Sequence, residues 1–580
     1  MKFYQYIITG VFGAAMLSSC TDLTEHPYTF VDPSSYYENE DQLNSALNTV
    51  YNSMRSVYND GGTFMRLEGC TDYGQPNREG NKNNINDINA WKYQNQENNA
   101  GTFTAVWTKA MACINRANNV IAQFESATMD ETVRKRAIGQ ARFLRGLSYY
   151  WIARIYGGAP IIKTVTKDLD NLSFPRATID ETYAFIIEDF EYAEENLPVR
   201  GISGYDVWRA SKGAAQAYLA NLYLYRASMA GTGGYKTFDK TLLEKAKSYC
   251  EKVISSGAYS LEPDFGNLWC SLNGDKARNN QESIFELQFS TLNGQQNGMH
   301  QNFGMFADST YPEEFVSFGK TISTGGGGSY YYLRTGPSAE AWQSYDAADE
   351  RLKVLISEGT YSKGGNTVHC KYNIDDKGSL NGSEGWGSCC PGNIKVHDFS
   401  TAARQALRSG NNFMAMRYAQ VLLDYAEAKA ELGEMDNSIW TQTIGAIRKR
   451  AGITGSTLTT VPTTVDNYLK TNFYPNVTDA AIMEIRRERA IELCLEGRRT
   501  DDLIRWGCGK QLASAPWTGI NIDAINTPID LDGDGTNDIC FYTTAAGKSA
   551  GETAGVTTID VSGTSGVTCI ANGSKYQLNY

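Results

Sequence analysis

Apolar residues recur every three or four positions through much of the first half of the chain. In the segment 42–57, for example, Leu43, Leu47 and Val50 fall on one face of a helix. Small residues such as Gly146 and Gly213 stand where neighbouring helices would touch, and they would allow close approach. The same spacing predicts further helices over 103–124, 131–156, 180–197, 207–230 and 242–255. Because short links join these segments, we expect consecutive helix pairs stacked into a superhelix.

The pattern changes after residue 256. From about 257 to 412 the chain is rich in Gly, Asn, Ser and Tyr, which predicts long surface loops with short strands. Helical spacing returns over 417–432, 438–451 and 480–495, whereas Thr, Gly, Ser and Ala dominate from residue 543. We interpret that last segment as edge strands or a poorly ordered tail. The expected organisation is one body over 20–580: a mainly α scaffold (about 40–256 and 413–510), a loop-rich binding region (257–412) and a C-terminal loop and tail (511–580).

The N-terminus has the pattern of an export signal. Lys2 is followed by an apolar run that is too short to span a bilayer as a helix, which takes about 20 residues. The run ends in Leu-Ser-Ser-Cys, the pattern of a bacterial lipobox with Cys20 as the acylated residue. We therefore expect residues 1–19 to be a lipoprotein signal peptide and the mature protein to be anchored to a membrane by lipid at Cys20.

Composition excludes some functions. The chain of 580 residues has a net charge of -12, which argues against nucleic-acid binding, because that binding depends on neutralising phosphates. It has four histidines without ligand-type spacing, so a His-rich zinc enzyme is not expected. Tyrosine is abundant, at 35 residues, and suits stacking and hydrogen bonding to polar ligands. Cys113, Cys250 and Cys494 fall in helical patterns as small apolar residues, whereas Cys540 falls in loop-like sequence where it could form a disulfide.

Aromatic residues in the loop-like segments are the candidate ligand-binding residues. Aromatic rings stack on the C–H faces of sugars while nearby carboxylates and amides bind the hydroxyls. Local loop packing is the alternative for each of them and stays open. The predicted ligand-binding residues are Asp72, Tyr73, Trp91, Tyr330, Tyr331, Trp342 and Trp386.

The segment 530–538 resembles a calcium-binding loop. Its carboxylates alternate as in the first half of an EF-hand loop, and Gly535 stands where that loop turns sharply. Phe541 occupies the position of the missing bidentate glutamate, and an acidic turn without metal remains the alternative. A structural Ca²⁺ ion would have as its ligands Asp530, Asp532, Asp534, Thr536 and Asp538.

The segment 482–506 is dense in charge. Glu488, Glu492 and Glu496 share one helix face among arginines. Paired carboxylates could support glycosidase chemistry, but neighbouring guanidiniums would lower their pKa values and disfavour the required acid. We therefore interpret the segment as a structural ion-pair network. No catalytic serine, nucleotide-binding or dinucleotide-binding motif is present.

Several segments, in order, resemble the SusD/RagB family of outer-membrane lipoproteins. They are the lipobox, the entry helix at 30–58, and segments 106–121, 140–162, 186–198, 209–227, 416–433 and 485–507. The resemblance spans about 20–510. The family's usual Pro-containing C-terminal motif has no counterpart after Asp560.

This resemblance implies tetratricopeptide-like helix pairs carrying a loop-rich α/β binding face. It implies a surface-exposed lipoprotein, not an enzyme, that binds an oligosaccharide or polysaccharide and passes it to a SusC-like TonB-dependent outer-membrane transporter. Peptide capture on the same scaffold, as in the RagB branch, is the alternative. A surface glycoside hydrolase is a third possibility, supported only by carboxylates in the Tyr-rich loops.

Overall fold

The computed structural model describes most of the helical part of the chain and isolated pieces of the rest. The described residues are 39–59, 74–76, 96–165, 173–229, 237–269, 274–292, 294–296, 331–333, 349–351, 359–363, 366–370, 410–494, 496–508, 518–522, 524–529, 535–537, 539–560, 570–572 and 575–579. Among these residues no helix is both long enough and apolar enough to cross a membrane. The signal segment and Cys20 lie outside them.

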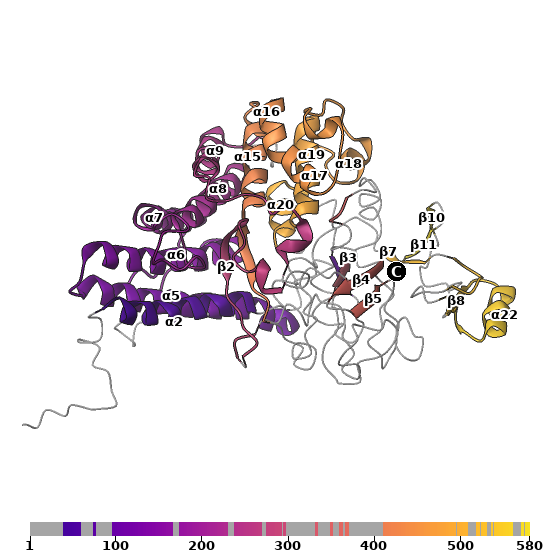
Figure 1. The fold of residues 1–580 in the computed structure, drawn as a ribbon, viewed down its shortest axis with the longest axis horizontal. Helices are drawn as coiled ribbons and strands as arrows, with labels where there is room; N and C mark the ends of the chain where they lie inside the picture. Colours follow the sequence, from indigo (N-terminus) through magenta and orange to yellow (C-terminus); the bar gives the residue numbers. More distant parts are fainter. Residues whose placement is uncertain are drawn as a thin grey trace, which may run out of the picture.

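The N-terminal helices stack side by side, as the hydrophobic spacing predicted (Figure 1). Their bounds are α2 Glu40–Asn59, α5 Gln96–Ser126, α6 Glu131–Tyr156, α7 Ile179–Asn196, α8 Lys212–Met229 and α9 Lys240–Ser255. The α8 helix starts five residues later than the predicted 207, because Ser211 accepts a hydrogen bond from the backbone N–H of Ala214 and begins the helix there. Asp130 and Thr178 cap α6 and α7 in the same way.

Small residues bring the helices close together, as expected. A Cβ atom on Gly146 of α6 would lie 3.0 Å from the Phe190 ring of α7. A Cβ atom on Gly213 of α8 would lie 2.5 Å from the hydroxyl of Tyr259. Both contacts are too short for any larger residue without movement, so Gly146 allows α6 and α7 to pack closely and Gly213 allows Tyr259, which follows α9, to pack on α8.

A second helical group follows in the chain and packs on α8 and α9 (Figure 1). Strand β2 (Ser283–Leu287) pairs antiparallel with β6 (Phe413–Arg417), which leads directly into α15 (Tyr418–Glu431). The predicted helix 438–451 is divided into α16 (Asn437–Trp440), a π-helical turn η4 (Thr441–Gly445) and α17 (Ala446–Arg450). The remaining helices are α18 Asn467–Asn472, α19 Ala480–Glu492 and α20 Arg499–Arg505, with short 3₁₀ turns η2 Phe265–Leu268, η3 Gly274–Ala277 and η5 Ser456–Leu458.

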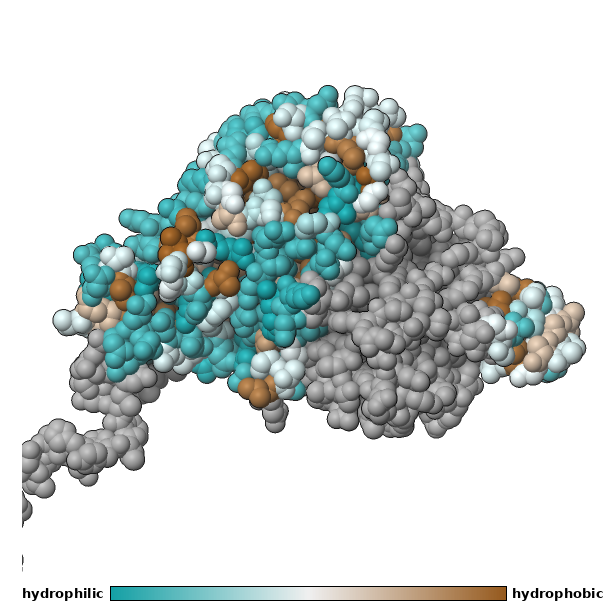
Figure 2. Space-filling view, in the orientation of Figure 1, coloured by the Kyte–Doolittle hydropathy of each residue, from teal (hydrophilic) through white to brown (hydrophobic). Residues whose placement is uncertain are grey.

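The outside of the helical part is mostly hydrophilic on the face seen in Figure 2. Three exposed apolar residues, Val199, Ile202 and Val207, lie in the link between α7 and α8. The apolar stripes of the helices face inward, where one continuous cluster of buried side chains joins α2 through α9 with β2 and β6. Trp151 is part of this core, and Trp107 packs against it.

Short strands make up the described part of the loop-rich region. Strand β1 (Gly74–Pro76) pairs with β3 (Tyr331–Leu333), and β4 (Gly359–Lys363) forms a hairpin with β5 (Asn366–Cys370). Strands β7 (Thr518–Ile522), β10 (Ile570–Asn572) and β11 (Lys575–Asn579) form one antiparallel sheet near the C-terminus. Within 257–412 the described strands β3, β4 and β5 are each three to five residues long, as expected for short strands, while much of that region lies outside the described residues.

The segment after residue 543 is more ordered than the sequence predicted. Strands β8 (Ile539–Tyr542) and β9 (Thr557–Asp560) are parallel neighbours joined by α22 (Ala545–Ala554). The prediction of edge strands or a tail was wrong over α22, where Thr544 caps an Ala-containing run and Gly555 ends it with φ of 71°.

The structure shows the environment of four cysteines discussed above. Cys540 is not in a loop but in β8, as a buried free thiol. Cys113, Cys250 and Cys494 are also buried and form no disulfide, as the helical pattern predicted. These four thiols therefore act as small apolar residues of the interior rather than as disulfide partners.

Candidate functional site

The pairing of β1 with β3 brings together two parts of the chain that carry predicted ligand-binding residues. Gly74 lies opposite Leu333, and Pro76 lies opposite Tyr331. Asp72 and Tyr73 immediately precede β1 in the sequence, and Tyr330 immediately precedes β3. Segments about 250 residues apart in sequence are thus joined by backbone hydrogen bonds.

The structure describes only part of the predicted site. The backbone of Tyr331 is described, within β3. The other predicted ligand-binding residues lie outside the described residues: Asp72, Tyr73, Trp91, Tyr330, Trp342 and Trp386. Their role in binding therefore stays a prediction.

The predicted calcium loop is described only in part. Gly535 has φ of 91°, the left-handed conformation that the sharp turn of such a loop needs. Ile529 and Ile539, which flank the loop in sequence, exchange two backbone hydrogen bonds of 2.8 and 3.3 Å. Thr536 is described, whereas Asp530, Asp532, Asp534 and Asp538 lie outside the described residues. No group of three or more His, Cys, Asp or Glu residues suited to a metal ion occurs in the described part, and calcium binding stays a prediction.

The charged helix α19 lies at the centre of a buried ion-pair network. The carboxylate of Glu492 is fully buried and accepts hydrogen bonds from three guanidiniums. Arg351 donates at 3.0 Å and Arg417 at 2.5 Å, and Arg450 donates as well. These arginines come from an isolated described piece of the loop-rich region, from the end of β6 and from α17, so one carboxylate joins three distant parts of the chain.

Glu488 extends the network one helical turn toward the start of α19, and Glu496 extends it from the turn that follows the helix. The prediction that all three glutamates share one helix face was wrong for Glu496, because α19 ends at Glu492. Glu488 accepts from Arg351 at 2.6 Å and from Arg448 at 2.8 Å. Glu496 accepts two hydrogen bonds from Arg417, at 2.9 and 2.8 Å. Each carboxylate faces arginines from other elements, so these three glutamates hold separate parts of the chain together.

The protonation of this network excludes the acid role that a glycosidase would need. Burial alone would raise the pKa of Glu488, but Arg351 and Arg448 outweigh it and hold that pKa below its usual value. In Glu492 burial is likewise outweighed, by Arg450, Arg417 and Arg351, and the pKa is lowered. Both groups are therefore ionised at neutral pH. The interpretation as a structural ion-pair network is confirmed.

A second set of pairs joins α15, α19 and α20. Arg489 donates to Asp502 at 2.7 Å, and Arg505 donates to Asp502 at 2.9 Å. Arg505 also donates a hydrogen bond to each carboxylate oxygen of Glu427, at 2.5 and 2.6 Å. Trp506 completes this cluster by donating its indole N–H to Glu427 at 2.9 Å. The bidentate geometry fixes the orientation of α20 against α15.

Glu431, at the end of α15, behaves differently and gives a pH-dependent prediction. Burial raises its pKa from 4.5 to about 7, and Arg486, 3.6 Å away, only partly opposes this. Between those two values the folded state binds more protons than the unfolded state, so the stabilising contribution is complete below pH 4.5 and is lost as pH rises through 7. We expect the loss to be at most about 1.4 kcal/mol per pH unit.

The measurement is urea unfolding of the wild type and of Glu431→Gln at several pH values from 5 to 8. The wild type should lose stability relative to the variant as pH rises, because glutamine does not ionise. Two unfolding curves that stay parallel over this range would contradict the assignment.

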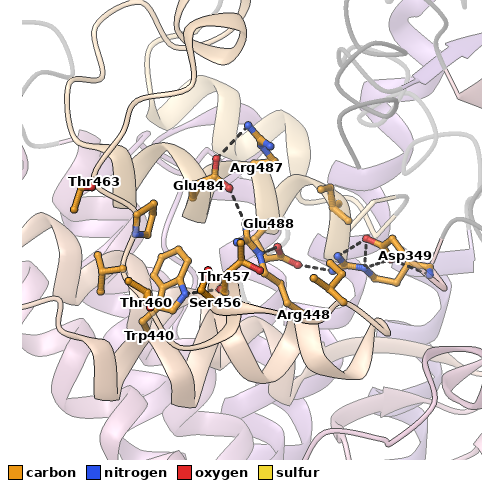
Figure 3. A pocket seen from close by; sticks show the side chains of 15 residues that line it. Asp349, Trp440, Arg448, Ser456, Thr457, Thr460, Thr463, Glu484, Arg487 and Glu488 are labelled. Atoms are coloured by element: carbon orange, nitrogen blue, oxygen red, sulfur yellow. Dashed lines mark hydrogen bonds and ion pairs between the residues drawn. The ribbon is translucent and has the colours of Figure 1, made fainter. Parts of the chain in front are cut away.

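A cavity of about 480 Å³ opens beside the network, between α19 and the segment that follows α17 (Figure 3). Ser456, Thr457, Thr460 and Thr463 lie on one side of it together with Trp440. The sequence analysis did not identify this cavity. The run of hydroxyl residues at 456–463 was the only signal, and such runs are common in loops.

Comparison with known proteins gives the family. A model described as "SusD family" matches residues 281–532, and one described as "Starch-binding associating with outer membrane" matches residues 29–224. A SusD-like protein from Formosa agariphila is 26% identical over 523 residues, which are 88% of this chain and 92% of the relative.

Solved structures share the fold. A SusD homolog from Bacteroides thetaiotaomicron aligns with a TM-score of 0.62 and 22% identity, over 83% of this chain and 89% of that one. A SusD-like carbohydrate-binding protein from Bacteroides fragilis aligns with a TM-score of 0.61 and 20% identity, over the same shares, 83% and 89%. The helical fold and the two family-model matches agree: the chain belongs to the SusD/RagB family.

Proposed function

We propose that this protein binds carbohydrate at the outer membrane and passes it to a SusC-like TonB-dependent transporter. The observation that carries the proposal is the β1–β3 pairing, which joins two Tyr-containing segments of the predicted binding face. The family description of starch binding and outer-membrane association supports it, as does the carbohydrate-binding relative with the same fold.

The helical body and the loop-rich region would have different roles. The helical body, held by a large apolar core and by buried ion pairs, provides a rigid support. The loops that the helical body carries would bind the ligand. Aromatic and polar side chains on these loops can adapt to a ligand, while the scaffold holds the ends of each loop in place. We propose that the role is binding without catalysis and that Cys20 carries the lipid anchor.

The test is calorimetric titration of residues 21–580 against a panel of neutral and acidic oligosaccharides. We expect one class to bind saturably, and Trp91→Ala and Trp386→Ala each to weaken it at least about fivefold, since stacking on one ring contributes about 1–3 kcal/mol by analogy with base stacking. Phe174→Ala, a change at an exposed ring beside α7, is the matched control and should leave affinity unchanged. Binding of peptides with no response to any sugar would contradict the proposal and favour the RagB-like alternative.

We also propose a structural calcium ion in the loop 530–538. In 1 mM CaCl₂ the melting temperature of the wild type should rise by a few degrees over its value in EGTA, because an ion that binds only the folded state stabilises it by about 2.7 kcal/mol at 100 times its Kd. The double variant Asp530→Asn/Asp532→Asn should lose this response. A melting temperature that is the same in calcium and in chelator would contradict the proposal.

A further inference from the structure

The cavity beside α19 is built from well-fixed elements. Its outer wall, the segment 453–463, is held against the helices: the indole N–H of Trp440 donates to the carbonyl of Thr457 at 2.9 Å. Asn437 accepts a hydrogen bond from the backbone N–H of Val461 at 2.9 Å. A Cβ atom on Gly445 would lie 1.9 Å from the carbonyl oxygen of Leu458, so this wall and the π-helical turn are in direct backbone contact. The cavity is therefore preformed.

The inner wall of the cavity, on the α19 side, carries equal numbers of positive and negative side chains. Glu484 accepts a hydrogen bond from Arg448 at 2.7 Å and forms an ion pair with Arg487 at 3.1 Å. Arg448 also donates to Glu488 at 2.8 Å. Arg351 and Asp349, paired at 2.7 Å, close the far end (Figure 3). Three guanidiniums and three carboxylates thus cancel, and a ligand with net charge would gain no Coulomb attraction and would lose hydration.

Free hydrogen-bonding capacity nevertheless remains in this wall. The Nε of Arg487 has no hydrogen-bond partner within the described structure, but it is buried away from solvent, so a ligand would have to bind the outer polar atoms of the paired side chains. Arginine and carboxylate groups already paired with each other can still donate to and accept from a polyol.

The outer wall complements this chemistry. Thr460, Ser456 and Thr463 are exposed and present hydroxyl groups. Ile453, Val461 and Pro462 alternate with them and provide apolar surface. A cavity of about 480 Å³ with apolar patches and a few aimed polar groups is of the size and kind that holds a small ligand. Apolar C–H faces and many hydroxyl groups without net charge are the features of a neutral sugar.

We propose that this cavity is a second carbohydrate site, specific for the end of an uncharged oligosaccharide and separate from the loop site. The inference rests on the proposed function for its ligand class. This second site would lie on the helical scaffold, between the segment 453–463 and α19. Within the described residues, none of the predicted loop aromatics lines it. Arg487 and Arg448 would bind hydroxyl oxygens, and Thr460 and Thr463 would accept or donate on the opposite side.

The test uses maltotriose and cellotriose, two neutral trisaccharides whose glucose units are joined by α- and β-linkages respectively. Trigalacturonate is the charged probe. Calorimetric titration and crystal soaking are made with residues 21–580 and with two blocking variants, Thr460→Trp and Thr463→Trp. Their matched controls are Thr459→Trp and Thr464→Trp, exposed neighbours that do not line the cavity. All four changes are at exposed positions, and an unchanged melting temperature confirms that each variant is folded.

We expect a neutral trisaccharide to occupy two sites in the wild type and one site in the blocking variants, with both controls like the wild type. Trp386→Ala should remove the other site only. One-site binding that Trp386→Ala abolishes and the blocking variants leave unchanged would overturn the second site while the proposed function stands. Trigalacturonate binding that the blocking variants remove would overturn its neutral specificity. No response to any sugar would overturn both proposals together.

Discussion

Glu492→Gln should lower the free energy of unfolding by about 3–5 kcal/mol, because it removes a buried negative charge and weakens the pairing of three guanidiniums at once. The carboxylate is 0% exposed and contacts Arg351, Arg417 and Arg450. An amide of the same shape keeps the packing, so the loss measures charge pairing rather than volume. Urea unfolding at pH 7, followed by circular dichroism, gives the value.

A surface pair provides the control. Glu131 contacts Lys135 at 2.8 Å within α6, and its side chain is 67% exposed. Glu131→Gln should leave the unfolding midpoint nearly unchanged, because exposed pairs are screened by solvent. Adding Arg450→Met to Glu492→Gln should cost less than the sum of the two single changes, since both changes remove the same Arg450–Glu492 interaction. Equal, small effects of Glu492→Gln and Glu131→Gln would show that the network does not hold the fold.

Phe143→Ala should cost a similar amount, about 3–5 kcal/mol, by leaving a cavity where four elements meet. Phe143 is fully buried in α6, and its ring centre lies 5.6 Å from Phe190 of α7, 5.6 Å from Tyr218 of α8 and 5.0 Å from Phe285 of β2. The ring is thus one of the points at which the N-terminal helix stack contacts the strand pair leading to α15, as is the Tyr58–Phe413 contact. Its removal should lower the melting temperature in a single cooperative transition.

An exposed phenylalanine serves as the comparison. Phe174 is 38% exposed in the link before α7, and Phe174→Ala should change stability by less than about 0.5 kcal/mol. If Phe143→Ala instead split unfolding into two steps, the helix stack and the β2–β6 unit would be separate folding units joined only at this ring.

Helices were the part of the fold that could be predicted from the sequence. Repeats such as Leu43, Leu47 and Val50 recur at the helical period and are all buried. Residues such as Asp130 and Thr178 mark helix starts because their side chains bond to nearby backbone N–H groups. These signals are local, and the structure reproduces them within a few residues.

Contacts between distant segments could not be predicted. The β1–β3 pairing joins three-residue strands that have no periodicity to identify them. The partners of Glu492 come from three separate elements, so the sequence indicated a network but not which arginines form it. The α22 helix was missed because glycines at 547 and 551 resemble a turn-rich tail; in the structure they allow contact with Asn526 and Cys540.

The most direct test of carbohydrate binding at the β1–β3 face is hydrogen–deuterium exchange of residues 21–580 with and without the oligosaccharide that binds in calorimetry. The account predicts slower exchange in peptides covering 72–76 and 330–333 when sugar is bound, with α5 to α9 unchanged. Slower exchange confined to the helical scaffold, with 72–76 and 330–333 unaffected, would contradict it.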